Sequence, residues 1–144
     1  MKTTDKSIIV EQTFNQSIET VWNSITRVEL MRQWFFDNIP AFESKVGFET
    51  QFNIATPNRN FIHLWRVTEV IPLKKITSNW KYEGYQGDSF VTFELFREND
   101  LTKLKLTTKV VESFPEDIPE FKRESGLEGW NYFICKKLKE FLEK

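Results

Sequence analysis

Apolar residues recur along this chain with two different periods, one typical of helices and the other typical of strands. The segment 7–14, SIIVEQTF, is rich in β-branched residues and bounded by polar ones, which predicts a first strand. Ser17 is a candidate N-cap for a helix over the next residues, IETVWNSIT. A second short helix is expected over VELMRQWFF, where Leu30 and Trp34 are four residues apart and Pro40 follows.

From residue 41 to residue 113 apolar and polar positions alternate, as they do in strands. Strands are expected near 47–55, 60–71, 74–83, 87–98 and 101–112, with a further short strand around 41–44. Because the connections between them are short, the strands should form antiparallel hairpins. The residues expected on the covered face of the last two strands are Val91, Phe93, Leu95, Leu104, Leu106 and Thr108.

An amphipathic helix is expected to close the chain. Two start signals compete, Asp117 and Ser125, each with a glutamate three residues later. Glycine costs about 1 kcal/mol relative to alanine inside a helix, so Gly126 and Gly129 favour a late start or a break. The expected apolar stripe consists of Leu127, Trp130, Ile134, Leu138 and Phe141, and Phe133 widens it.

These patterns predict an α+β fold in a single domain over residues 1–144. A curved antiparallel sheet of about six or seven strands would wrap around the long C-terminal helix, with two short helices after the first strand. A helix laid across a twisted sheet touches its middle but not every edge. The aromatic residues, 15% of the chain, would therefore wall a hydrophobic pocket as well as fill a core.

Composition narrows the functional classes. A formal net charge of −1 offers no basic field for phosphate backbones, which argues against nucleic-acid binding. The one cysteine, Cys135, cannot form an internal disulfide, so a reducing compartment fits. No stretch has the apolar core of a signal peptide or the length of a membrane span. We therefore expect a cytoplasmic protein that does not insert into membranes.

Four segments carry a family resemblance. They are SIETVWNSIT after the first strand, MRQWF in the second helix, WRVTEVIPLKKITSNW across two strands, and GLEGWNYFICKKLKEFLE at the end. These segments resemble the START-like, or SRPBCC, superfamily with its helix-grip fold. Within it they are similar to the bacterial homologues of the activator of the heat-shock-protein-90 ATPase. The resemblance covers nearly all of the chain.

The resemblance implies a deep cavity between sheet and helix that takes hydrophobic or amphipathic small molecules. It also implies a range of roles, which includes lipid carriers, sensors, polyketide aromatases or cyclases, and a co-chaperone. A shared fold does not choose among these roles. The expected partner is a hydrophobic small molecule, with a chaperone as the alternative, and the chain is expected to be a monomer or a homodimer.

Few residues offer chemistry of their own. His63 is the only histidine and the obvious candidate for acid–base work. No motif pairs it with a carboxylate, so we interpret it as a residue of the cavity wall. The alternation of apolar residues does not decide which face of the sheet it occupies. Cys135 is interpreted as a small hydrophobe, and one histidine and one cysteine far apart form no usual metal site. The sequence therefore predicts no catalytic residue, no metal and no cofactor.

The residues expected to line the cavity are Trp34, His63, Trp65, Ser78, Trp80, Phe93, Thr108, Trp130 and Ile134. His63 or Ser78 would supply a polar contact. Gly126 and Gly129 either leave room for a ligand beside Trp130 or mark the start of the helix, and both interpretations fit equally.

Three functions follow, in order of preference. The first is non-catalytic binding of a lipid-like or aromatic small molecule. The second is an enzyme of aromatase or cyclase type on a polyketide-like substrate, with His63 as general acid or base. The third is an interaction module that regulates a chaperone ATPase.

Overall fold

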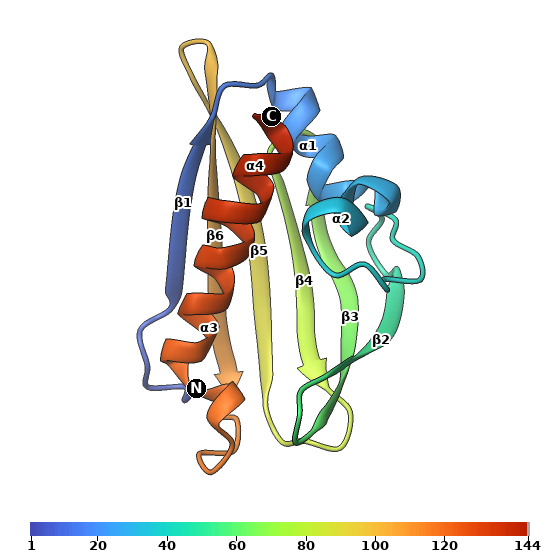
Figure 1. Cartoon of the computed structure of the whole chain (residues 1–144), viewed down its shortest axis with the longest axis vertical. Coiled ribbons are helices and arrows are strands. Elements are labelled where there is room, and N and C mark those ends of the chain that lie inside the picture. The colour runs from blue at the N-terminus through green and yellow to red at the C-terminus, as the bar shows by residue number, and fades with distance from the viewer. Residues whose placement is uncertain (144) are drawn as a thin grey trace.

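The computed structural model describes residues 1–143 and places helices on one face of a six-stranded sheet (Figure 1). In chain order the elements are β1 (Ile8–Phe14), α1 (Ile18–Thr26), α2 (Val28–Trp34), β2 (Glu49–Ala55), β3 (Asn60–Ile71), β4 (Lys75–Tyr82), β5 (Asp88–Glu98), β6 (Leu101–Glu112), η1 (Pro119–Phe121), α3 (Arg123–Trp130), η2 (Asn131–Leu138) and α4 (Lys139–Leu142). The expected α+β helix-grip architecture, with two short helices after the first strand, is confirmed.

The sheet has the strand order β1-β6-β5-β4-β3-β2, and every neighbouring pair is antiparallel. Strands β2 to β6 form a meander of hairpins, and β1 pairs with β6 at the edge. The register shifts between Val67 and Glu69 in β3 and again near Asp88 in β5. Such irregularities bend and twist a sheet locally, and the C-terminal helix crosses the face of the curved sheet in Figure 1.

The prediction of a short strand around residues 41–44 is wrong. These residues belong to an irregular connection between α2 and β2. Phe42 supplied the apolar signal, but its ring packs against Phe48 and Trp65, with centroid distances of 5.8 and 6.3 Å. Packing against other rings, not strand pairing, therefore accounts for this apolar position.

The two short helices begin and end for identifiable reasons. Ser17 caps α1 as expected, because its Oγ accepts a hydrogen bond from the Thr20 backbone N–H at 3.2 Å. Helix α2 ends at Trp34, two residues before the end of the expected segment, and Phe35 has φ −107° and ψ −140°. Phe35 and Phe36 thus leave the helix, and their rings pack against β3 residue Trp65.

Helix α3 begins at Arg123, so neither Asp117 nor Ser125 is its N-cap. Lys122 occupies the cap position without a side-chain hydrogen bond. The Arg123 guanidinium instead donates to the backbone carbonyls of residues 6–7 at 2.9 and 3.2 Å. A tertiary contact with the segment before β1 therefore accompanies the helix start, where the local sequence suggested a capping box.

The C-terminal helix changes type along its length, because η2 is a π-helix between α3 and α4. A π-turn closes an i→i+5 hydrogen bond and holds more residues than an α-turn. Side chains spaced by four residues therefore keep one direction along this mixed helix. The buried positions are Trp130, Ile134, Leu138 and Leu142, whereas Leu127 and Phe141 from the expected stripe are only partly buried.

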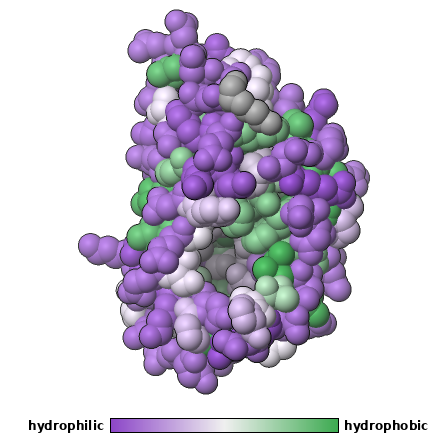
Figure 2. Space-filling model, viewed as in Figure 1, coloured by the Kyte–Doolittle hydropathy of each residue, from purple (hydrophilic) through white to green (hydrophobic). Residues whose placement is uncertain are grey.

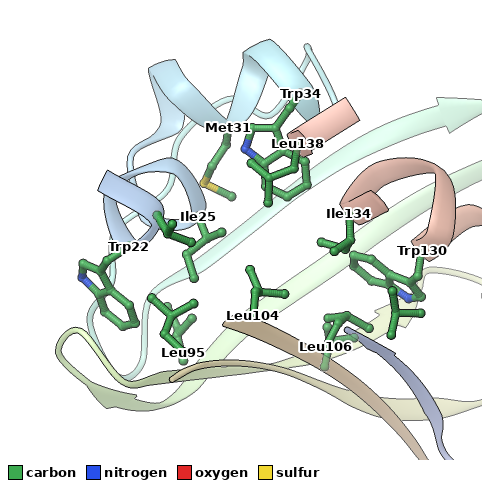
Figure 3. Close-up of a cluster of buried hydrophobic side chains, with 14 of the residues drawn as sticks. Trp22, Ile25, Met31, Trp34, Leu95, Leu104, Leu106, Trp130, Ile134 and Leu138 are labelled. Carbon is green, nitrogen blue, oxygen red and sulfur yellow. The ribbon is translucent and has the colours of Figure 1, made fainter. Parts of the chain in front are cut away.

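The main core lies between this helical stripe and the inner face of the sheet. Figure 3 shows Ile134 and Trp130 above Leu104 and Leu106 of β6, and Ile134, Leu104 and Leu106 are completely buried. A second, smaller cluster surrounds Phe61, Phe114 and Phe121 beside the start of α3. No helix within residues 1–143 is long and apolar enough to cross a membrane.

Candidate ligand-binding site

A cavity of about 140 Å³ lies between the C-terminal helix and the inner face of the sheet. Figure 2 shows the hollow beside the lower part of that helix, with hydrophobic residues along one side. Four of the expected residues line it, namely His63, Trp80, Thr108 and Trp130. An apolar cavity of about 150 Å³ can bind benzene, so the volume suits a molecule with one ring.

A second, much smaller pocket of about 20 Å³ lies deeper under α1 and α2. Four expected residues line it, namely Trp65, Ser78, Trp80 and Phe93. Trp80 and Phe35 line both spaces, so the two lie next to each other. We call them the outer cavity and the inner pocket.

The remaining two expected residues, Trp34 and Ile134, line neither space. Both are buried in the core. The Trp34 indole Nε1–H donates to the carbonyl of Ser24 at 2.8 Å, which ties α2 to α1. Their positions indicate a structural role under the ligand space.

His63 points to the inner face of the sheet, which answers the question of face that the sequence left open. Its Nδ1 is 3.0 Å from the Phe61 carbonyl oxygen, and a carbonyl only accepts, so Nδ1 carries the proton. Burial lowers the pKa of His63 to about 4. The ring is therefore neutral near pH 7, and Nε2 remains a hydrogen-bond acceptor in the wall of the outer cavity.

Tyr82 lies beside His63, with ring centroids 4.8 Å apart in an edge-to-face arrangement. Its hydroxyl oxygen accepts a hydrogen bond from the Trp80 indole Nε1–H at 3.0 Å. Burial raises the pKa of Tyr82 to about 12, so the hydroxyl keeps its proton. Since the oxygen already accepts from Trp80, that proton is available to donate into the outer cavity.

Two hydroxyls from β5 and β6 complete the polar part of the wall. The Ser89 Oγ donates to the Trp80 carbonyl at 2.7 Å. Thr108 is 5% exposed, and its Oγ1 has no hydrogen-bond partner. Most buried polar side chains in native proteins are hydrogen-bonded, so the Thr108 hydroxyl is an exception with an unused hydrogen-bonding capacity.

One charged side chain, Glu120, reaches the rim of the outer cavity. Its carboxylate is 3.0 Å from the Arg59 guanidinium and accepts a hydrogen bond from the Thr56 hydroxyl at 3.0 Å. A hydrogen bond from its own backbone N–H is the main cause that lowers the pKa of Glu120, with Thr56 and Arg59 acting in the same direction. The charge is thus paired at the edge.

The histidine, the cysteine and the carboxylates are the side chains that bear on catalysis. Within residues 1–143 no cluster of histidine, cysteine and carboxylate side chains could hold a metal ion. Burial raises the pKa of the Cys135 thiol, which opposes a nucleophilic thiolate, and Cys135 does not line the outer cavity. The Nδ1 hydrogen bond of His63 goes to a backbone carbonyl, not to a carboxylate. The wall is suited to holding a neutral molecule.

Sequence reasoning missed several lining residues, including Phe35, Phe36, Tyr82 and Phe133. Tyr82 had a usable signal, because it lies two residues after Trp80 on the same strand and so on the same face. Phe133 widened the expected stripe. Phe35 and Phe36 gave no such signal, because their direction depends on where α2 ends.

The curved sheet closed over a long C-terminal helix is the helix-grip fold, and with the family match that follows it makes the chain a member of the START-like, or SRPBCC, superfamily. The family described as Activator of Hsp90 ATPase homolog 1-like protein matches residues 15–143, and the chain belongs to this family. The comparison with curated proteins found no match.

Solved structures share the fold over nearly the whole chain. Protein CV1439 from Chromobacterium violaceum superposes with a TM-score of 0.79 at 17% identity, covering 96% of this chain and 97% of that one. DynU16, a protein of the dynemicin biosynthetic locus, gives 0.77 at 20% identity over 97% of this chain and 48% of DynU16. The Aha1 dimer from Colwellia psychrerythraea gives 0.70 at 19% identity, covering 96% and 97%. At these identities the likeness shows the fold.

Proposed function

We propose that this single domain binds one small hydrophobic or amphipathic molecule in the outer cavity and catalyses no reaction on it. The observation that carries the proposal is the Thr108 hydroxyl, which is buried in the cavity wall without a partner. Leaving a buried hydroxyl unsatisfied costs free energy. A bound molecule with a hydroxyl or carbonyl group supplies the missing partner.

The wall also favours an uncharged ligand. Apart from Glu120 at the rim, no charged side chain among the described residues lines the outer cavity. His63 is neutral and accepts, and Tyr82 is neutral and donates. Moving an ion into such surroundings costs far more than moving a hydroxyl that finds a partner. A small phenol or alcohol therefore fits the wall better than a carboxylate or an amine.

The first test is native mass spectrometry of the freshly purified protein, with extraction of any bound molecule. We expect a defined neutral adduct. Calorimetric titration with phenol then compares the wild type with Gly129→Leu, because Gly129 lines the cavity and a Cβ there meets no atom within 4 Å. We expect phenol to bind the wild type and not the variant. No adduct together with no phenol binding would contradict the proposal.

A second candidate is an enzyme of aromatase or cyclase type, and the free Nε2 of His63 in the cavity wall is the observation that favours it. A base with a pKa of about 4 is poorly matched to proton abstraction at neutral pH, which supports binding over catalysis. Turnover of a polyketide-like substrate that disappears in His63→Ala would favour the enzyme. Turnover that survives in this variant would remove His63 from that role.

The family description favours a third candidate, a chaperone partner. Adding the purified protein to purified Hsp90 and measuring ATP hydrolysis tests it directly. A rise in ATPase rate that persists in Gly129→Leu would favour an interaction module that does not use the cavity. An unchanged rate, with no complex by size-exclusion chromatography, would dismiss it.

A further inference from the structure

The ring of Phe35 separates the outer cavity from the inner pocket. Phe35, Trp80 and Val91 line both spaces, so the two share one stretch of sheet as their floor. The Phe35 ring has centroid distances of 5.6 Å to Trp65 on the inner side and 4.9 Å to Phe133 on the outer side. It therefore occupies the space through which the two would otherwise connect.

Each space is lined by one residue whose side chain carries a buried polar atom without a partner. Within residues 1–143, two buried side-chain polar atoms lack a hydrogen bond, the Thr108 Oγ1 and the Trp65 Nε1. Thr108 lines the outer cavity and Trp65 lines the inner pocket. Trp65 is only 5% exposed. Native proteins satisfy most buried polar atoms. Since one unpartnered atom belongs to a residue of the outer cavity and the other to a residue of the inner pocket, we infer that one ligand extends into both spaces.

We propose that the outer cavity and the inner pocket are two halves of one elongated site, which takes a neutral, rod-shaped molecule of two rings. One end carries a hydroxyl that bonds Thr108, His63 and Tyr82, and the other carries an acceptor, such as a ketone, that receives the Trp65 Nε1–H. Phe35 holds the place of the second ring until the ligand displaces it. This inference rests on the proposed function and specifies its ligand class.

The backbone around Phe35 allows this displacement. Trp34 is held by its hydrogen bond to the Ser24 carbonyl, so helix α2 stays in place. Phe35 is the first residue beyond the helix, and the chain from 36 to 48 contains no helix or strand. The Phe35 ring can therefore change direction by rotation about its own side-chain bonds, which leaves the hydrogen bond from the Phe35 N–H to the Met31 carbonyl in place.

The experiment compares three probes by calorimetry. Phenol fills one half of the site, 4-phenylphenol has two rings and one polar end, and 4-acetyl-4′-hydroxybiphenyl has two rings and both polar ends. In Phe35→Ala the two spaces join, and because the ligand need no longer displace a ring, we expect about tenfold tighter binding of both biphenyl probes. Phenol affinity should change by less than about twofold.

Phe36→Ala is the matched control, because Phe36 lines the outer cavity and not the inner pocket. It removes the same ring from the neighbouring position and should not improve binding of the biphenyl probes. Equal improvement in both variants would overturn the role of Phe35. Circular dichroism confirms that each variant is folded before titration.

Two conservative variants test the polar ends without depending on Phe35→Ala. Trp65→Phe should weaken 4-acetyl-4′-hydroxybiphenyl about fivefold and leave 4-phenylphenol unchanged, since only the first has an acceptor at that end. Thr108→Val should weaken all three probes. If Trp65→Phe weakened the binding of the two biphenyl probes equally, the proposed hydrogen bond between the Trp65 Nε1–H and the ligand would be wrong.

The outcomes separate this inference from the proposed function. Phenol binding without binding of either biphenyl probe, to wild type and Phe35→Ala alike, would overturn the elongated site and keep a one-ring binding protein. No binding of phenol or of the biphenyl probes to any variant would overturn both.

Discussion

At the scale of single residues, three side chains give the cavity wall its polar character. His63 can accept through Nε2, Tyr82 can donate its hydroxyl proton, and Thr108 can do both. Burial opposes the charged form of both His63 and Tyr82, with pKa values of about 4 and about 12. Apart from Glu120 at the rim, the wall is therefore neutral over the whole physiological pH range, which favours uncharged molecules.

The unpartnered hydroxyl of Thr108 predicts a stabilising substitution. Replacing Thr108 with valine removes a buried group that has no hydrogen bond, so we expect the free energy of unfolding to rise by about 1 kcal/mol. Chemical denaturation of the ligand-free protein measures it. Thr102→Val is the matched control on the same strand, because the Thr102 hydroxyl donates to the Gln16 carbonyl at 2.8 Å.

In that control the Gln16 carbonyl loses its partner, and we expect a loss of about 1–2 kcal/mol. Equal losses in the two variants would show that the Thr108 hydroxyl is satisfied in solution. If Thr108→Val instead raises the free energy of unfolding and lowers the affinity for phenol, the Thr108 hydroxyl serves ligand binding and destabilises the folded protein.

Trp130 packs the C-terminal helix against the sheet. Its ring contacts Trp80 at 5.4 Å and Phe93 at 5.9 Å between centroids, and it is 8% exposed. Trp130→Ala should lower the free energy of unfolding by about 3–5 kcal/mol, because it leaves a large void in the core. Tyr132→Ala, on the exposed side of the same helix, should change it by less than about 0.5 kcal/mol. A loss below about 1 kcal/mol for Trp130→Ala would mean that the helix does not seal the core.

At the scale of elements, the two glycines of α3 have different functions. Both lie inside the helix, so neither marks its start. A Cβ at Gly126 would lie 3.0 Å from the Ile8 Cδ1, which makes close packing against β1 the reason for that glycine. Both glycines line the outer cavity, but a Cβ at Gly129 would meet nothing within 4 Å. The glycine at 129 is therefore kept for space.

This difference predicts unequal gains in stability when each glycine is replaced by alanine. Gly129→Ala should raise the free energy of unfolding by about 1 kcal/mol, because alanine is the better helix former and no atom obstructs its Cβ. Gly126→Ala should gain less, since its Cβ must push against Ile8. Thermal unfolding of the two variants measures the contrast. Equal gains would contradict the assigned roles.

The strands and the first two helices could be predicted from the sequence because each is decided locally. Alternation gave the strands from β1 to β6 within one or two residues, although it also suggested a strand around 41–44 that does not form, and Ser17 caps α1 as expected. The start of the C-terminal helix could not be predicted in this way, because the Arg123 contact with residues 6–7 is tertiary. The π-helix has no local sequence signal that we recognised, and it moved the buried stripe from Phe141 to Leu142.

The candidate site, like the fold, could be predicted only in part from the sequence. Strand alternation placed Trp80 and Thr108 on the inner face, where both line the outer cavity. Their role in binding stays a prediction. Phe35 was missed, because a ring just beyond a helix end takes its direction from the dihedral angles of that end. The division of the space into two parts therefore became visible only in the structure.

At the scale of the whole molecule, one hydrophobic cluster joins α1, α2, the sheet and the C-terminal helix. Small domains with one core usually unfold in a single cooperative step. The ionisation of one buried group is then linked to the stability of the entire chain. His63 is the only histidine. Its contribution to the pH dependence of stability can therefore be measured between the usual pKa values of the carboxylates and pH 7.

The last prediction is the pH dependence that follows. The pKa of His63 is about 4 in the folded protein and 6.5 in the reference state, so between these values the unfolded chain binds the extra proton. Stability should therefore be complete above about pH 6.5 and fall as the pH drops toward 4, by about 3 kcal/mol over the whole window. His63→Gln cannot titrate, and its unfolding free energy should be nearly flat between pH 6.5 and 5. Urea denaturation at several pH values compares the two proteins. Parallel curves for wild type and variant would mean that the His63 imidazole titrates normally in the folded state and is open to water, which would also remove it from the neutral wall of the cavity.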